Sequence, residues 1–591
     1  MLALVCAACS EVHLAADAGG SPVLPETDAA TSDPPTDASA AIDARAQPDA
    51  GCVGVLCTSA TGALECRASG PETQCGRACE PCPSAAHAIA ACDPFDRCTL
   101  ECDVGYLREG DACVAVGIAP PLPLSPLSTQ RTSTQRPTLR AEIAPGTDGA
   151  LVEVCADRAC SEVLWSARTR TGLVRPERAL GAGVRWVRWR GLVSDAVGTR
   201  ASASWQVVLP RVDREADLAW GFSRDLDGDG YDELVTSGAD VRVYRGSAGG
   251  PETSPALVLP TGRASIVGDL DGDGLAELVR STEGFDQHVF VAYGRAVVGE
   301  MREVELVVPE GAGTFGWLPG ARIAAGDLDG DGFGELAIGC ELCAGRQGQV
   351  YVYAGSESGL GATPVALTSP LAHSYNYFGR SMGGAFDVDG DGYGDLAIAS
   401  PGSPTGVFVF RGGPTGVVSG APPWGGPSRA DLAWTSEGSL RMRVGMGADL
   451  DGDGRAELSA LVAGTSGGEV RTLLGSALAH ATLLDASLTV ASAWWEAPYE
   501  GVDDGPFVAG DLDGDGRLDR VHAIPSGSDA IGELADIGWG YFVVPAGTTL
   551  ITAAGDVNAD GLADLLYEGP TPHVLLGTGC WWRETPRAIG E

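Results

Sequence analysis

Asp387-Val388-Asp389-Gly390-Asp391-Gly392-Tyr393-Gly394-Asp395-Leu396 is the stretch that decides how this chain folds. Its acidic side chains stand at alternate positions, and an apolar run follows. A hard cation needs several oxygen ligands at once, and a tightly turned loop can direct alternate carboxylates at one point. Similar stretches begin at six further positions, so the chain holds seven candidate cation loops, each named here by its first aspartate: Asp225, Asp269, Asp327, Asp387, Asp449, Asp511 and Asp556.

The loops recur at regular distances within a constant order of segments. Successive first aspartates are 44, 58, 60, 62, 62 and 45 residues apart. An apolar run leads into the loop, a second follows it, and a third ends in glycine, as in 241–246, 350–355 and 407–412. Each loop is therefore expected to join two adjacent antiparallel strands. Three or four strands per repeat, seven times, predict an all-β fold with a seven-bladed β-propeller.

The ligand set favours calcium over magnesium. In loop 387 four aspartates supply carboxylates, and the carbonyl of Tyr393 can supply a further oxygen. Calcium accepts such a large and flexible shell, whereas magnesium keeps more of its water. Gly392 is expected to take the positive φ that turns the chain beneath the ion.

An EF-hand or dockerin loop opens with the same Asp-x-Asp-x-Asp-Gly pattern but needs a bidentate glutamate at its twelfth position, leading into a helix. The corresponding residues of the seven loops are not acidic, and each lies in or next to a strand-like run: Thr236, Arg280, Ile338, Ile398, Ala460, His522 and Tyr567. The EF-hand interpretation is therefore excluded.

The repeats resemble the FG-GAP repeats (VCBS type) of the integrin α-subunit propeller and of related bacterial surface proteins. The fullest match is Phe378-Gly379, then loop 387, then Ala399-Ser400-Pro401-Gly402, and Phe315-Gly316 precedes loop 327. The resemblance covers roughly residues 211–591. It implies a propeller that binds up to seven structural Ca²⁺ ions, although integrin propellers usually fill only some of their blades.

Carried over to each loop, the resemblance assigns the side chains at the first, third, fifth and ninth positions and the carbonyl at the seventh. These residues are Asp225, Asp227, Asp229, Tyr231, Glu233; Asp269, Asp271, Asp273, Leu275, Glu277; Asp327, Asp329, Asp331, Phe333, Glu335; Asp387, Asp389, Asp391, Tyr393, Asp395; Asp449, Asp451, Asp453, Arg455, Glu457; Asp511, Asp513, Asp515, Arg517, Asp519; and Asp556, Asn558, Asp560, Leu562, Asp564. Loop 556 departs from the pattern at Asn558 and Ala559 and is expected to be among the weaker sites.

The charge of the chain fits this interpretation. The formal net charge is −40, from 39 basic and 79 acidic residues. Nucleic acid is a poor partner for such a chain, because nothing resembles a basic face that could neutralise phosphates. Six loops carry four carboxylates each and the last carries three, and without bound cations these groups would repel one another. Calcium is the economical explanation of the excess of acid.

The first 50 residues predict export and a tether. Residues 1–10 are apolar and end in small residues before Cys9, which resembles a bacterial lipoprotein signal with Cys9 as the lipid acceptor. An ordinary secretory signal or a simple chain end is the alternative. Residues 11–50, rich in Ala, Asp, Pro and Thr, cannot bury enough apolar surface to fold and are expected to be a disordered tether. The predicted location is extracellular or the outer-membrane surface, with membrane contact only through Cys9.

Residues 51–116 are expected to form a small disulfide-rich module. Ten cysteines lie between Cys52 and Cys113, which indicates five bridges of undetermined connectivity in an oxidising compartment. No histidine stands at zinc-ligand spacing, so a zinc knuckle is disfavoured. The segment from Cys102 to Cys113 resembles the last loop of EGF-like modules.

After a proline-rich joint, residues 119–210 contain runs that alternate at period two and predict a β-sandwich that resembles fibronectin type III or immunoglobulin-like domains. We interpret this domain as a spacer. Cys155 and Cys160 flank a short turn and are expected to pair. Trp186 and Trp189 are expected to be core or sheet-face residues.

The leading functional hypothesis is a non-enzymatic, calcium-stabilised propeller that acts as a protein-binding or adhesion module. The alternative is a lectin, because tryptophans such as Trp220, Trp317 and Trp434 could form aromatic pockets. Catalysis is disfavoured, since the seven histidines are scattered and no Gly-x-Ser-x-Gly or His-Glu-x-x-His motif is present. Cys340 and Cys343 are expected to form a disulfide that braces a turn. The ligand, a protein or a glycan, is not identified.

Overall fold

We analysed a computed structural model of the chain. It describes eight short strands between residues 55 and 115 by their backbone, and residues 118–589 with gaps at 194–195, 283–287, 308, 310–322, 371–374, 403–404, 417–431, 437–440, 447–448, 451–452, 465–466, 474, 476–488, 496–506, 527–528, 535–537, 544, 546–547, 549 and 579–585. No helix within these residues is long and apolar enough to cross a bilayer. The chain divides into two compact units, 1–117 and 118–591.

The first unit contains four two-stranded antiparallel sheets. Their strands are β1 (Val55–Thr58) with β2 (Leu64–Arg67), β3 (Gln74–Cys75) with β4 (Glu80–Pro81), β5 (Ala88–Cys92) with β6 (Cys98–Cys102), and β7 (Tyr106–Glu109) with β8 (Ala112–Ala115). The tether and the cysteine side chains of the predicted disulfide-rich module lie outside the described residues, so the pairing of the ten cysteines stays a prediction.

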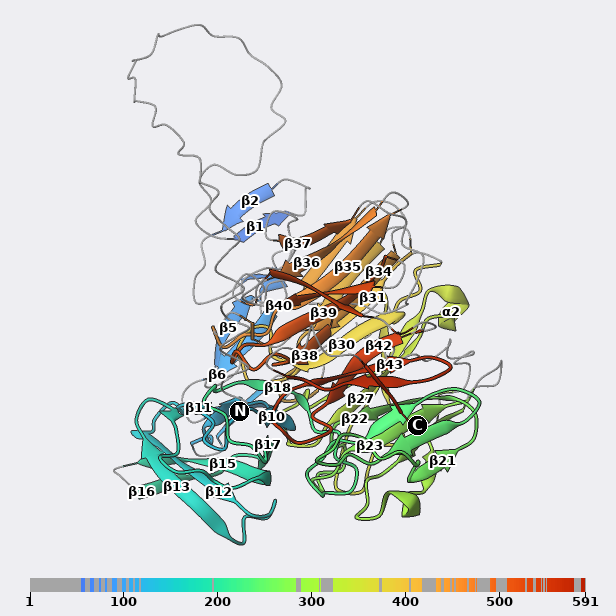
Figure 1. Ribbon diagram of the computed structural model, residues 1–591. Helices are drawn as coiled ribbons and strands as arrows, with labels where there is room; N and C mark the ends of the chain where they lie inside the picture. Colours follow the sequence, from blue (N-terminus) through green and yellow to red (C-terminus); the bar gives the residue numbers. More distant parts are fainter. Residues whose placement is uncertain are drawn as a thin grey trace, which may run out of the picture. The chain divides into compact units, whose positions relative to one another are not determined.

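The second unit begins with two facing sheets, the sandwich. One has the order β14-β11-β9, and the other β13-β12-β15-β17-β10-β18, with β16 beside β15. Figure 1 shows β12, β13, β15 and β16 side by side. The strands are β9 (Leu122–Ser125), β10 (Gln130–Thr132), β11 (Leu139–Glu142), β12 (Gly149–Cys155), β13 (Val163–Thr169), β14 (Leu173–Val174), β15 (Gly183–Val193), β16 (Ala196–Ala201), β17 (Trp205–Leu209) and β18 (Ala219–Phe222).

The sandwich has its own core, drawn from both sheets. Leu139 of β11 packs in one buried cluster with Val152, Trp189 and Val207 of the larger sheet. Alternate residues of these strands point into the core, which is the period-two pattern that predicted the fold. The disulfide between Cys155 and Cys160 is present, as predicted.

Seven small antiparallel sheets follow along the described chain. Sheet 1 has β19 (Leu234–Thr236), β20 (Val241–Tyr244) and β21 (Leu257–Leu259); sheet 2 has β22 (Arg263–Val267), β23 (Glu277–Ser281), β24 (Val289–Ala292) and β25 (Glu303–Glu305); sheet 3 has β26 (Ile323–Gly326), β27 (Glu335–Cys340), β28 (Gln349–Tyr353) and β29 (Val365–Thr368); sheet 4 has β30 (Ser381–Phe386), β31 (Asp395–Ser400), β32 (Thr405–Phe410) and β33 (Leu432–Ser436); sheet 5 has β34 (Arg441–Met446), β35 (Leu458–Gly464), β36 (Gly467–Leu473) and β37 (Thr489–Trp495); sheet 6 has β38 (Phe507–Gly510), β39 (Asp519–Ser526), β40 (Asp529–Leu534) and β41 (Gly538–Val543); sheet 7 has β42 (Leu550–Gly555), β43 (Asp564–Glu568), β44 (His573–Leu575) and β45 (Arg587–Ala588). Two short helical turns, η2 (Val298–Glu300) and α2 (Cys343–Arg346), complete the described elements.

Consecutive sheets pack face to face, as the blades of a propeller do. Buried clusters join sheets 1 and 2, 2 and 3, 3 and 4, 4 and 5, and 6 and 7. Sheet 5 meets sheet 6 where the Arg520 guanidinium donates to Ser459 Oγ at 3.1 Å. Sheet 1 shares a buried cluster with sheet 7, in which Leu234 and Tyr244 pack with Leu566 and Val574. The sheets therefore close into a ring, and the predicted all-β propeller fold is confirmed.

The cation loops lie where the sequence predicted them, between the first and second strands of a sheet. Loop 387, for example, joins β30 to β31, which pair antiparallel. Loop 225 is different, because the strand that precedes it, β18, pairs with β10 of the sandwich and not with β19. The twelfth position of every loop lies in a strand, in agreement with the exclusion of an EF-hand.

Candidate cation loops

Each loop is wound around the carboxylate of its first aspartate. In loop 387 the backbone N–H of Gly390 donates to Oδ1 of Asp387 at 2.5 Å, and that of Gly392 donates to Oδ2 at 2.7 Å. Both glycines have positive φ, 80° and 89°, which side-chain-bearing residues rarely adopt. The positive φ predicted for Gly392 is thus confirmed. The sixth-position N–H makes the same bond to the first carboxylate in all seven loops.

The ninth-position acid ties the loop to the third strand. Oδ2 of Asp395 accepts the N–H of Val388 at 2.8 Å, and Oδ1 accepts the N–H of Gly412 at 2.9 Å. A Cβ at Gly412 would collide with the carbonyl oxygen of Gly394. This collision explains the glycine that ends the third strand of the repeats. The bond from the second-position N–H to the ninth-position acid is present in all seven loops.

Carboxylate oxygens converge within five of the loops. One oxygen from each residue of the following groups lies within 4.8 Å of the others: Asp269, Asp271, Asp273 and Glu277; Asp225, Asp227 and Asp229; Asp327, Asp329 and Glu335; Asp387, Asp389 and Asp395; Asp511, Asp513 and Asp519. These oxygens are close enough to share one cation, and an all-oxygen set suits a hard ion.

The remaining predicted ligands do not join these groups in the described structure. In loop 449, Asp451 lies outside the described residues. Loop 556 has Asn558 where the other loops have an aspartate at the third position. Its amide donates a hydrogen bond to Oδ2 of Asp560 at 3.0 Å. The fifth-position carboxylates of all seven loops accept the seventh-position N–H at 2.8–3.0 Å. Coordination by the seventh-position carbonyls stays a prediction.

Burial and close neighbours raise the pKa of the first- and ninth-position carboxyl groups of several loops, so these groups resist ionisation. Burial first, and then neighbouring carboxylates, raise the pKa of Asp225 to about 6, of Asp387 to about 7 and of Asp327 to about 8. The pKa of Asp395 is raised well above its usual value by the same two causes, with Asp389 and Asp387 as the neighbours. A bound cation would reverse this balance, since an opposite charge favours the ionised form.

Two arginines form ion pairs with the aspartates at the third position of their loops. Arg245 Nη2 is 2.7 Å from Oδ2 of Asp227 in loop 225, and Arg411 Nε is 3.2 Å from Oδ2 of Asp389 in loop 387. Both arginines directly precede the glycine that ends the third strand. The sequence interpretation missed them, although their shared position beside that glycine is a visible signal.

The loops are also linked to one another around the ring. The eighth-position N–H donates to the carbonyl of the preceding loop's first aspartate, as from Ala276 to Asp225 at 2.9 Å and from Gly394 to Asp327 at 2.9 Å. The bond from Asp232 to Asp556, at 3.3 Å, joins the first loop to the last. Six of the seven such links are described, so the loops form a nearly continuous hydrogen-bonded circle.

The sandwich and the segment after it cover the loops. The sixth-position glycine of each loop lies against residues of 118–217: Gly230 against Arg211, Gly274 against Trp186, Gly332 against Ser204, Gly392 against Pro123, Gly454 against Arg140, Gly516 against Ala216 and Gly561 against Arg214. Arg158 Nη1 also donates to the carbonyl of Gly332 at 2.8 Å, and Trp205 Nε1 donates to that of Gly330 at 3.3 Å. A side chain at the sixth position would therefore disturb this contact as well as the loop.

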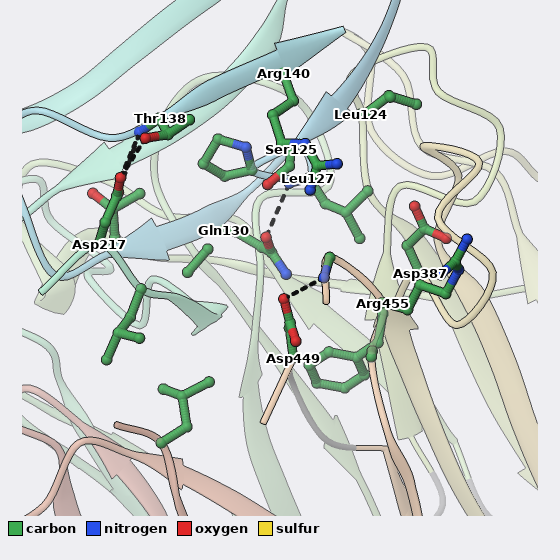
Figure 2. Close-up of a pocket in the computed structure, with 18 of the residues that line it drawn as sticks. Leu124, Ser125, Leu127, Gln130, Thr138, Arg140, Asp217, Asp387, Asp449 and Arg455 are labelled. Carbon is green, nitrogen blue, oxygen red and sulfur yellow. Dashed lines mark hydrogen bonds between the residues drawn. The ribbon is translucent and has the colours of Figure 1, made fainter. Parts of the chain in front are cut away.

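A pocket of about 400 Å³ lies between the sandwich and loops 387 and 449. Figure 2 shows Asp387, Asp449 and Arg455 on one side of it, and Arg140 and Leu124 of the sandwich on the other. Its lining mixes apolar, acidic and basic side chains, so it indicates no single class of ligand. It does show that parts of two loops border a space large enough for solvent.

Parts of this chain are similar to known repeat families and to integrin α subunits. Residues 225–280 match the family described as FG-GAP-like repeat, and residues 319–353 and 378–419 match the FG-GAP repeat. Integrin alpha-4 of Xenopus laevis is 34% identical over 149 residues, which cover 24% of this chain and 14% of that protein. Integrin alpha-10 of Homo sapiens is 38% identical over 91 residues, which cover 15% and 8%.

The chain thus spans only a small part of the length of these integrins. Among solved structures, the Dos1 propeller is similar at a TM-score of 0.35 and 10% identity, covering 72% of this chain and 91% of that one. This likeness is too low to carry an argument, and the fold is described from the chain's own sheets.

Proposed function

Because this chain carries FG-GAP repeats, we propose that it is a non-enzymatic, calcium-stabilised, seven-bladed propeller that binds a protein partner outside the cell. The observation that carries the proposal is the convergence of carboxylate oxygens in the repeated loops, within 4.8 Å of one another in five of them. The raised pKa of the first-position carboxyls adds to it, because a buried group of acids gains most from a cation.

The first-, third-, fifth- and ninth-position acids would hold the ion, with the seventh-position carbonyl. Bound calcium would supply the positive charge that these buried acids lack. The residues themselves already fix the loop between two strands, since the first and ninth carboxylates accept backbone N–H groups from the loop and the third strand. We therefore propose a structural role for calcium, with loop 269, where four acids converge, as the best-formed site.

We place the partner-binding surface at the opposite ends of the strands. The sandwich and the segment after it together lie against all seven loops, which leaves the loop face little room for a large partner. Because strands alternate in direction, the turns between second and third strands lie at the other edge of each sheet, with the connections from one sheet to the next.

One patch at that edge, between sheets 3 and 4, has the features of a binding site. Leu342 and Tyr375 are 37% and 55% exposed, and the Arg346 guanidinium lies 5.7 Å from the centre of the Tyr375 ring. Arg346, Tyr375 and Tyr377 all have positive φ, as does Ala344. Strained backbone of this kind often marks functional surfaces. The disulfide between Cys340 and Cys343, predicted from the sequence, is present and fixes the turn.

A carbohydrate ligand is the second candidate, and the exposed Tyr375 ring is the observation that favours it. Sugars stack on exposed aromatic faces, whereas Trp220, one of the tryptophans considered from the sequence, is buried in the core between sheets 6 and 7. Trp317 lies outside the described residues, and so does the side chain of Trp434.

The test is capture of partners by the full chain on an array of surface proteins and glycans, with calcium and with chelator. We expect protein partners that are lost in Tyr375→Ala and Arg346→Ala but kept in Val258→Ala, a matched exposed residue on the outer strand of sheet 1. Signals from glycans alone would favour the lectin, and binding unchanged in both patch variants would overturn the assignment of the surface.

Display at the surface remains part of the proposal. The N-terminal segment would carry the propeller outward through a tether, anchored at Cys9 or released. Labelling of intact cells with an antibody to the propeller, before and after protease treatment, would test it. A signal only after lysis would contradict it.

A further inference from the structure

We propose that the sandwich acts as a latch that holds the propeller ring closed. The side chain that makes this connection is Arg131. Arg131 lies in β10 of the sandwich, and its guanidinium reaches the seam between sheets 1 and 7. There it forms an ion pair with Asp232 of loop 225 and lies 3.6 Å from Oδ2 of Asp556 of loop 556. All three side chains are buried, at 6%, 0% and 2% exposure.

Only the loop at this seam has an acidic residue, Asp232, at its eighth position. It is the eighth residue of loop 225, and the other six loops carry small or apolar residues there: Ala276, Gly334, Gly394, Ala456, Leu518 and Ala563. Its carboxylate is fully used, since it also accepts the N–H of Arg224 at 3.0 Å and that of Asp556 at 2.7 Å. The chain thus places one extra buried acid where its first and last loops meet, and the sandwich supplies the matching cation.

The backbone of the sandwich reaches the same seam. β10 pairs with β17 of the sandwich on one side and with β18 on the other. Trp220 of β18 packs into the core between sheets 6 and 7, with Leu565 and Tyr567, and the Arg131 guanidinium lies 5.7 Å from the centre of the Trp220 ring. One strand pair therefore joins the sandwich both to the start of sheet 1 and to the core beside sheet 7.

The seam needs such a latch because no described strand bridges it. Sheet 7 completes itself with β45, from its own C-terminal end, and sheet 1 is formed by β19, β20 and β21 alone. The two sheets are joined by their shared core and by backbone bonds such as Ser247 N–H to the carbonyl of Val557 at 3.1 Å. In a closed ring the seam between chain ends is where opening begins, because there the two neighbouring sheets are not consecutive in sequence.

Removing one member of this buried pair should open the seam selectively. Arg131→Met removes the guanidinium that lies between two buried carboxylates, and breaking a buried pair on one side is far costlier than replacing both partners. Asp232→Ala installs the residue that three other loops carry, and should be milder because Arg131 keeps Asp556. The double variant should then be no worse than Arg131→Met alone.

The experiment is hydrogen exchange of the full chain followed by mass spectrometry, for these three variants and for Arg188→Met. Arg188 is a matched control, because its 2.8 Å ion pair with Glu153 lies within the sandwich. In Arg131→Met we expect amides of β19, β20, β43 and β44 to exchange on the order of a hundredfold faster, while those of β27, β28, β31 and β32 keep their wild-type rates. The control should leave the seam unchanged.

Equal acceleration in all sheets, wild-type rates at the seam, or additive effects in the double variant would overturn the latch. If Arg131→Met does not fold, Asp232→Ala carries the same test with a smaller local effect. Each sample is measured with calcium and with chelator. The latch predicts the seam effect in both buffers, so it can fail while calcium still stabilises the loops, and the reverse is equally visible.

Discussion

Ala559 is the residue at which the seventh loop carries a side chain in a left-handed conformation that glycine adopts in other loops. It occupies the fourth loop position with φ of 53°, where five described loops have a glycine with φ of 73–80°. A left-handed conformation costs a residue with a Cβ about 1–2 kcal/mol. Loop 556 therefore adopts the common loop shape at the expense of strain.

We predict that Ala559→Gly stabilises the protein by about 0.5–1 kcal/mol, the relief of strain less the greater entropy of glycine in the unfolded chain. The reverse change at the same position of loop 387, Gly390→Ala, should destabilise by a similar or larger amount. A Cβ there would meet Arg455 at 3.4 Å and the Gly454 carbonyl oxygen at 3.8 Å, both ordinary contact distances, so the effect reports mainly on the backbone. Denaturant unfolding measures the change in the free energy of unfolding for both variants. Changes of the same sign in the two variants would refute the prediction.

At the scale of the loop, the nine-residue unit is a hydrogen-bonded frame that presents acids to a common point. The first carboxylate organises the turn, the ninth joins the loop to the third strand, and the third and fifth add charge. Five loops bring such oxygens within 4.8 Å of one another, and Arg245 and Arg411 reduce the charge in two of them. The loops are therefore expected to differ in calcium affinity.

We predict that native mass spectrometry will find one calcium fewer in Asp269→Ala than in the wild type, because this variant removes the carboxylate around which loop 269 is wound. Asp213→Ala, an acid outside the loops, is the control and should bind the wild-type number. An unchanged count in Asp269→Ala would show that loop 269 is not a site.

The raised pKa values predict how pH acts on the calcium-free protein. Asp269 and Asp387 have a folded-state pKa of about 7, above the ordinary value of 3.8, so the folded state binds more protons than the unfolded state between about pH 4 and pH 7. The free energy of unfolding in chelator should thus fall as pH rises through this window. Calcium competes with protons for the same groups, so its stabilisation should be larger at pH 8 than at pH 5. Thermal melts at both pH values test this, and a chelated protein more stable at pH 8 would contradict it.

The loops could be predicted from the sequence, but the contacts of the sandwich and of the segment after it, which cover them, could not. Alternating aspartates with glycines define a short-range geometry, so the strand–loop–strand unit, the positive φ of Gly392 and both turn disulfides could be predicted. The ion pair of Arg131 with Asp232 joins residues about a hundred positions apart, and no local pattern encodes such a pairing. The same holds for the strand pair β10–β18, which depends on how the sandwich meets the ring.

At the scale of the whole unit, residues 118–591 combine a ring of seven sheets with a sandwich that lies on its loops. The spacer role assigned to the sandwich from sequence is replaced in our proposal by that of a latch. Calcium and the sandwich would then act on the same face, the ion within each loop and the sandwich, with the segment after it, across all seven. The face at the opposite strand ends, with Tyr375, would remain for the partner.

The most direct test of the account is the thermal melt of the full chain in calcium and in chelator at pH 8. A ligand at a hundred times its Kd stabilises by about 2.7 kcal/mol per site, so several sites should raise the melting temperature by more than about 10 °C. We predict a shift of that size, restored when calcium is added back and not when magnesium is added. A melt that is the same in chelator and in calcium would contradict the claim that the repeated loops are structural calcium sites.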